Sequence, residues 1–205
     1  MNSKTIITIG REKGSGGHYI GQLLAVRLGI KCYDNEILYE TAKQSGFTKE
    51  FIEEFEEKRP SRFLYSLAMG SAAVSYNQPL HQQLYLAQTK VIKDIAERES
   101  CIFVGRCADY VLRDMPEVLS IFVHASLSDC VKRIQMTTNI TRQEAELLIM
   151  RTNKTRSEYY RHFTDKTWGN SKNYHLSIDS SDLTADGAAD LIMEHLKIRE
   201  KYQNR

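Results

Sequence analysis

The chain has 205 residues, of which 28 are Lys or Arg and 26 are Asp or Glu, so its formal net charge is +2. This near-neutral balance argues against a nucleic-acid coat protein, and a 41% apolar content is too high for a disordered chain. No apolar run approaches the roughly 20 residues that cross a bilayer, and the apolar stretch near the N-terminus is too short for a signal peptide. The four cysteines show neither a C-x-x-C pair nor a zinc spacing. We therefore expect a cytoplasmic protein with free thiols and with no membrane or nucleic-acid partner.

Short apolar segments rich in β-branched residues recur along the chain and predict five strands. They cover residues 4–9, 30–34, 101–104, 119–123 and 174–178. Helical patterns separate them, and short apolar strands that alternate with helices are typical of a parallel sheet covered on both faces. The predicted fold class is therefore α/β, with a five-stranded parallel sheet flanked by helices.

Cap residues mark several of the predicted helices. Gly29 is expected to end the helix that follows the first strand, and Ser128 to begin the helix after the fourth. Thr141 and Glu144 match a capping box that opens a helix to about residue 162. Further helices are predicted at residues 35–46, 48–59, 79–100, 107–113 and 184–199. No repeat or linker divides the chain, so we expect one domain over residues 1–205.

The most informative motif is the glycine-rich loop between the first strand and the first helix, from Gly10 to Gly17. Glycines let backbone N–H groups converge on an anion, and the helix N-terminus adds a partial positive charge. The side chains of Arg11 and Lys13 would add full charges. The position favours a phosphate site, although a tight turn without a ligand stays possible at this stage.

Neither standard phosphate-loop pattern fits this loop fully. Gly14 and Gly16 match the first two glycines of G-x-G-x-x-G, but Tyr19 stands at the third. The pattern G-x-x-x-x-G-K-[ST] fails at three positions, where the chain has Arg11, Gly17 and His18. The loop is thus an atypical Walker A sequence that lacks the usual lysine.

Six separated segments together resemble the cytidylate kinase-like family, a branch of the P-loop nucleoside monophosphate kinases. They are residues 7–17, 33–38, 104–112, 121–125, 159–164 and 168–176, the last with Trp168-Gly169 and Asn173-Tyr174-His175-Leu176. The resemblance implies a P-loop kinase-like three-layer sandwich. It further implies a helical acceptor-binding region at about 35–100 and a lid at about 142–170.

The resemblance implies a kinase that moves the γ-phosphoryl group of ATP, with Mg²⁺, to a nucleoside monophosphate, CMP or dCMP being the leading acceptors. In this reading the donor phosphates contact Gly14, Ser15, Gly16, Gly17 and His18. The charges that act in catalysis come from Arg11, Lys13, Arg156 and Arg161, because Arg in particular recognises phosphate oxygens. The acceptor contacts Asp34, Arg106 and Asp109. The metal ligands are unknown.

Two alternatives remain open from the sequence. The chain could phosphorylate another small acceptor on the same fold, or it could be a regulatory module that binds a nucleotide without turnover. The missing lysine favours the regulatory module, and the arginines of the lid favour a kinase. A homo-oligomer is possible, with the helix at 79–100 as a candidate interface.

Overall fold

The structure is a computed structural model that describes residues 4–34 and 80–203. The chain divides into two compact units, one made of Met1–Cys32 with Ser100–Arg205 and the other of Tyr33–Glu99. The predicted helices at 35–46 and 48–59 lie outside the described residues. In the second unit the structure describes the helix α5 (Leu80–Arg98) and a hydrogen bond from Tyr33 to Glu99.

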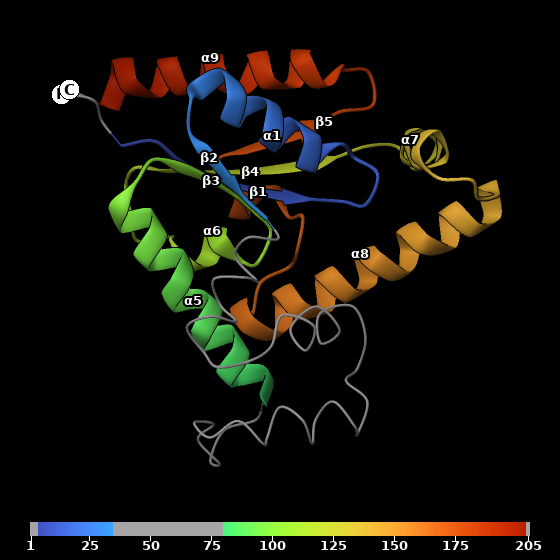
Figure 1. The fold of residues 1–205 in the computed structure, drawn as a ribbon, viewed down its shortest axis with the longest axis horizontal. Helices are drawn as coiled ribbons and strands as arrows, with labels where there is room; N and C mark the ends of the chain where they lie inside the picture. The colour runs from blue at the N-terminus through green and yellow to red at the C-terminus, as the bar shows by residue number, and fades with distance from the viewer. Residues whose placement is uncertain (1–3, 35–79, 204–205) are drawn as a thin grey trace. The chain divides into compact units, whose positions relative to one another are not determined.

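Five strands form one sheet in the order β2-β3-β1-β4-β5 (Figure 1). Their bounds are β1 Ile6–Arg11, β2 Lys31–Tyr33, β3 Cys101–Val104, β4 Val118–His124 and β5 Leu176–Asp179. The strand β1 is central and pairs in parallel with β3 and β4, while β4 pairs in parallel with β5. The predicted five-stranded parallel sheet flanked by helices is confirmed. Because parallel strands end at the same edge, the loops after β1, β3 and β4 lie beside one another.

Helices cover both faces of the sheet in the first unit. The helices α1 (Gly17–Leu28) and α9 (Ala185–Gln203) lie on one face and α6 (Ala108–Val111) on the other (Figure 1). The main core lies under α1 and α9, where Ile7, Ile9 and Leu24 are fully buried. Burying a side chain of this size contributes about 2 kcal/mol.

The helices α7 (Leu127–Thr137) and α8 (Arg142–Thr164) pack together around a second cluster that includes Val131 and Ile149. A single turn of 3₁₀ helix, η1 (Ser171–Asn173), precedes β5. Among the helices that the structure describes, none is both long enough and apolar enough to cross a membrane.

The helix ends test the capping predictions. Gly29 ends α1 in a left-handed conformation, and Thr141 with Glu144 forms the predicted capping box of α8. The prediction that Ser128 begins the helix after β4 is wrong, because Ser126 is the N-cap of α7. The Ser126 hydroxyl accepts the N–H of Asp129, three residues on, whereas Ser128 lies inside the first turn.

Candidate phosphate-binding site

The glycine loop has its backbone carbonyls engaged inside the protein. The carbonyl of Gly14 accepts from the guanidinium of Arg133 at 3.4 Å, and that of Ser15 accepts from the Ser180 hydroxyl at 2.7 Å. The Glu12 carbonyl accepts from the Ser15 hydroxyl at 3.0 Å, and the Gly16 carbonyl from the N–H of Ile20 at 2.9 Å. Some N–H groups of the loop are also bonded inside, since Glu12 donates to the Val123 carbonyl and Gly17 to the Ser15 hydroxyl. The loop N–H groups without a partner among the described residues include those of Gly14 and Gly16.

The helix α8 supplies two further contacts to the loop. The guanidinium of Arg156 donates to the carbonyl of Arg11 at 2.9 Å. The side-chain oxygen of Asn153 accepts the N–H of Lys13 at 2.8 Å. The N–H of Lys13 therefore already faces an oxygen atom, which shows that this amide points toward a position where an acceptor can bind.

Two glycines shape the loop by adopting a positive φ. Gly14 has φ 83°, and a Cβ there would lie 2.8 Å from the Cβ of Cys130, so only glycine fits against α7. Gly16 has φ 82° and is the N-cap of α1, and a Cβ added to it would meet no atom within 4 Å. The N–H groups of Gly14 and Gly16 make no hydrogen bond to another described residue. The open side of Gly16 and these amides lie at a helix N-terminus, which is the arrangement that phosphate-binding loops use.

Arg11 occupies the space beside the position where the usual lysine would stand. A Cβ on Gly17 would lie 2.6 Å from the Cβ of Arg11 and 3.2 Å from its Cγ. A Cβ on Gly105 would collide with the Arg11 guanidinium. The side chain of Arg11 therefore crosses over Gly17 and ends above Gly105, at the carboxyl end of β3. Glycine at both positions is what makes room for it.

The segment after β3 is conformationally unusual. Gly105, Arg106 and Cys107 have φ values of 82°, 60° and 53° in succession. Two consecutive non-glycine residues in the left-handed region are uncommon and cost on the order of 1–3 kcal/mol each. The Nε atom of Arg106 is buried. This strained turn fixes where Arg106 leaves the sheet edge, beside the guanidinium of Arg11.

Asp109, in the first turn of α6, lies in a cluster with two tyrosines. Tyr160 of α8 donates its hydroxyl to the Asp109 carboxylate at 2.7 Å. Burial raises the pKa of Asp109, and this outweighs the lowering by the Tyr160 hydrogen bond and by the charge of Lys166. Burial and the charge of Asp109 also raise the pKa of both Tyr160 and Tyr174, which stay neutral. The contacts around Asp109 therefore do not fully offset the free-energy cost of burying its ionised carboxylate.

The other predicted site residues lie in different surroundings. His18 is exposed in the first turn of α1, and Asp34 follows β2 and belongs to the second unit. Arg161 is exposed and lies about 140° around the axis of α8 from Arg156, so the structure does not bring it to the loop. The Ser15 hydroxyl is buried and donates to Glu12. Among the described residues no cluster of acidic, His or Cys side chains could hold a metal ion, so we assign Mg²⁺ no ligand.

Sequence reasoning missed Asn153, Arg133 and Ser180, the residues that hold the loop from outside. They lie 140, 119 and 165 residues from their loop partners. No local motif identifies them, because an arginine on a helix or a serine after a strand is common. The one available signal was the spacing of Asn153, Arg156 and Tyr160, which places all three on one face of α8.

Similarity to known proteins agrees with this geometry. The model of the cytidylate kinase-like family matches residues 6–182. An uncharacterised protein from Eubacterium ventriosum has a similar crystal structure, with 26% identity and a TM-score of 0.72 over 95% of this chain and 99% of that one. Shikimate kinase from Bacteroides thetaiotaomicron matches at 11% identity and TM-score 0.56, over 95% and 99% of the two chains. Shikimate kinase from Acinetobacter baumannii, in complex with shikimate, matches at 16% identity and TM-score 0.54, over 98% and 96%. No curated protein matches the sequence.

The sheet order and the glycine loop define a P-loop kinase-like fold, which the shikimate kinases share. The chain belongs to the cytidylate kinase-like family. This family and the P-loop kinase-like fold both support a phosphotransferase.

Replacing Asp109 by Asn tests the account of the buried carboxylate. The raised pKa means that the folded state binds a proton more tightly than the unfolded state, so wild-type stability falls as pH rises from about 4 through the folded-state pKa. We expect Asp109→Asn to remove this loss and to raise the free energy of unfolding at pH 7 relative to pH 4, measured by urea unfolding. Asp129→Asn is the control of opposite sign, because hydrogen bonds from Ser126 and Lys132 lower the pKa of Asp129. An Asp109→Asn profile that parallels the wild-type profile would contradict the account.

Proposed function

We propose that the chain transfers the γ-phosphoryl group of ATP to a nucleoside monophosphate, with CMP or dCMP as the first acceptors to test. In the transfer a bond forms between the acceptor phosphate oxygen and the γ-phosphorus, while the bond to the β-phosphate oxygen breaks and ADP leaves. Family membership supports a phosphotransferase, and the choice of acceptor rests on the resemblance to cytidylate kinases.

The observation that carries the proposal is the direction of the loop's backbone groups. The carbonyls of Glu12, Gly14, Ser15 and Gly16 are bound inside the protein, while the amides of Gly14 and Gly16 are available. A loop with this orientation repels cations and attracts phosphate oxygens, because carbonyl dipoles point inward and N–H dipoles point outward. An ordinary tight turn would not need an arginine and a buried serine to hold its oxygens.

Arg11 supplies the charge that the missing lysine would bring. Its guanidinium extends from the loop to the end of β3, the side from which Arg106 leaves the sheet. Negative charge spreads over the phosphoryl oxygens during transfer, and a cation at this place lowers its energy. Arg156 holds the backbone of Arg11 and so positions the same group, and Lys13 adds charge to the loop.

The amide of Lys13 supports a moving role for the Asn153 side chain of α8. Asn153 now gives this N–H an oxygen partner. A donor phosphate oxygen bound at the same N–H would replace the Asn153 oxygen, which requires the Asn153 side chain to turn aside while Arg156 keeps its contact with the loop. In this proposal the lid at about 142–170 closes over the donor and exchanges one oxygen acceptor for another.

The acceptor side is proposed from the segment after β3. Arg106 would contact the acceptor phosphate, and Asp34 and Asp109 would contact the rest of the nucleotide. A phosphate acceptor is already nucleophilic, so the reaction needs no strong general base. The roles of His18 and Arg161 as further phosphate contacts are part of the same proposal, as is use of ATP with Mg²⁺.

The direct test is to incubate the purified protein with ATP and Mg²⁺, to add single nucleoside monophosphates, and to follow ADP release. Turnover with CMP or dCMP alone would support the proposal. Turnover with shikimate or another non-nucleotide acceptor alone would show a kinase of different specificity, and ATP binding without turnover would show a regulatory module. Arg156→Ala should lower kcat by about 10²-fold or more, whereas Arg142→Ala, at the exposed start of the same helix, should not.

The role of Arg11 can be tested by exchanging it with the usual lysine. Gly17→Lys should lower ATP affinity and Tm, because its side chain would enter the space of the Arg11 Cβ and Cγ. Arg11→Gly should lower kcat because the cation is lost. The double variant Arg11→Gly with Gly17→Lys has the usual Walker A glycine and lysine, and should recover at least about tenfold over either single variant.

A double-mutant cycle on kcat/KM and Tm measures the coupling between the two positions. Additive losses in Tm and in kcat/KM would contradict the substitution of Arg11 for lysine, because two residues that share one space must couple. Gly187→Lys is the matched control, because Gly187 also lies near the start of a helix and has no positive φ, and this change should not couple to Arg11.

A further inference from the structure

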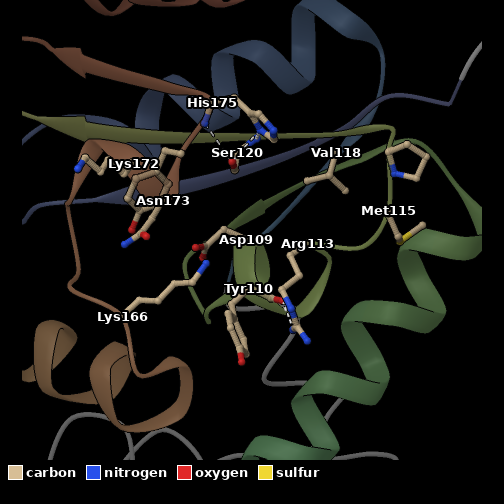
Figure 2. Close-up of a pocket in the computed structure, with 12 residues that line it drawn as sticks. Asp109, Tyr110, Arg113, Met115, Val118, Ser120, Lys166, Lys172, Asn173 and His175 are labelled. Carbon is tan, nitrogen blue, oxygen red and sulfur yellow. Dashed lines mark hydrogen bonds between the residues drawn. The ribbon is translucent and has the colours of Figure 1, made fainter. Parts of the chain in front are cut away.

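A separate cavity of about 280 Å³ lies on the face of the sheet that carries α6 (Figure 2). Its walls come from α6, from the segment between α6 and β4, from the first residues of β4 and from the segment between α8 and β5. Figure 2 shows the side chains of Asp109, Lys166 and Tyr110 gathered at one side and Ser120 with His175 at the sheet. The volume is just below the range of roughly 300–1,000 Å³ for pockets that hold drug-sized ligands, which suits a smaller molecule of metabolite size.

This cavity is distinct from the glycine loop. Ser120 on its wall pairs in register with Thr8, three residues and so roughly 10 Å before Arg11 along β1. Phe122, two residues after Ser120 on the same strand face, stands between them. Its ring lies 5.0 Å from the ring of Tyr174 and 5.2 Å from that of Trp168, centroid to centroid. A Cβ on Gly10 would lie 2.8 Å from the Phe122 ring, so the ring also packs against the strand that leads into the loop.

The cavity carries an excess of positive charge. Arg113, Lys166 and Lys172 line it, and Asp109 is the one carboxylate among the lining residues, which leaves a formal charge of +2. Neither lysine amine makes an ion pair with any residue that the structure describes, and Lys166 lies 5.7 Å from the centroid of the Tyr110 ring. The Arg113 guanidinium lies over the same Tyr110 ring, 4.2 Å from its centroid. Arg113 also forms an ion pair with Asp114, with 3.7 Å between Nη2 and Oδ2, so the excess of positive charge in the cavity rests on the two lysines. Such an excess favours an anionic ligand.

The floor is held rigidly from the neighbouring elements. Arg199 of α9 donates to the carbonyls of Val118 at 2.9 Å and Pro116 at 3.2 Å, which fixes the start of β4. The Nδ1 atom of His175 accepts the N–H of Ser120 at 3.0 Å, which places the ring proton of the neutral form on Nε2. The Ser120 hydroxyl is engaged with His175, lying 2.8 Å from its Nδ1 and accepting its backbone N–H at 3.2 Å. Asn173 donates its side-chain N–H to the Thr167 carbonyl at 2.8 Å, so its side-chain oxygen can accept from a ligand hydroxyl group.

We propose that this cavity is a second binding site, separate from the glycine loop, for a small phosphate-bearing molecule. The amines of Lys166 and Lys172 and the guanidinium of Arg113 bind the phosphate, and the side-chain oxygen of Asn173 accepts from a hydroxyl group beside it. The chemistry is shared by free phosphate and by the phosphate ester of a small polyol. The inference stands on the cavity and its charges and does not depend on the proposed kinase activity.

The experiment is a titration of ¹⁵N-labelled full-length protein with glycerol 3-phosphate, with inorganic phosphate and with glycerol, followed by ¹H–¹⁵N NMR. Shifts at Tyr110, Ser120 and Asn173 that saturate with the phosphate compounds, and not with glycerol, would support the site. Tighter binding of glycerol 3-phosphate than of inorganic phosphate would identify a phosphate ester as the ligand. Equal binding of the two compounds would identify the free phosphate ion. Shifts confined to Gly14, Gly16 and Lys13 would overturn the proposal, because the phosphate would then bind only to the glycine loop.

Variants that each remove one positive charge distinguish binding in this cavity from a general attraction of anions to the protein surface. Lys172→Gln and Lys166→Gln should each weaken binding of glycerol 3-phosphate by about tenfold, which is 1.4 kcal/mol. Lys197→Gln, an exposed lysine of α9 paired with Glu194, removes the same charge elsewhere and should leave the affinity unchanged. Equal losses in all three variants would overturn the proposal. Unchanged Tm values of the variants would show that the fold is retained, and Lys172→Arg should restore binding where Lys172→Gln does not.

Discussion

The orientation of the peptide groups between Arg11 and Gly16 is the constraint on which the site depends. A glycine-rich segment can turn either its carbonyls or its amides toward solvent, and these two choices bind ions of opposite sign. Here Arg133, Ser180 and Arg156 bind carbonyls from outside the loop, and the turn itself binds the others. These contacts join α7, α8 and the end of β5 to one loop, so the packing of three distant elements sets which peptide groups of the loop can meet the phosphate that we propose binds there.

The same constraint explains how the loop departs from the usual phosphate-loop sequence. A lysine at position 17 would need the space that Arg11 fills, and a side chain at position 105 would collide with its guanidinium. The arginine at the place of the first glycine and the glycine at the place of the lysine therefore share one space, and we propose that the first residue takes over the charge of the missing lysine. The positive charge remains, but it starts on the strand side of the loop instead of the helix side. An arginine in this role also offers a planar pair of donors to phosphate oxygens.

The sequence predicted those features that depend on neighbouring residues. The strand at Cys101–Val104 is apolar throughout and ends at a glycine, and the Thr141 capping box needs only residues three apart, so both were predictable. The start of α7 was placed at the wrong serine because Ser126 and Ser128 are equally good caps, and only the packing of the helix separates them. Asn153 and Ser180 were missed since their loop partners lie 140 and 165 residues away, and the facing sides of α8 depend on tertiary packing.

The most direct test of the central claim is the response of the loop amides to the donor nucleotide, by ¹H–¹⁵N NMR of the full-length protein with a non-hydrolysable ATP analogue. The account predicts large downfield proton shifts at Gly14 and Gly16, because their N–H groups gain charged acceptors. It also predicts a change at Lys13 and at the side chain of Asn153, as a phosphate oxygen replaces the amide oxygen on the Lys13 N–H. Saturable binding that leaves Gly14 and Gly16 unshifted would contradict the account.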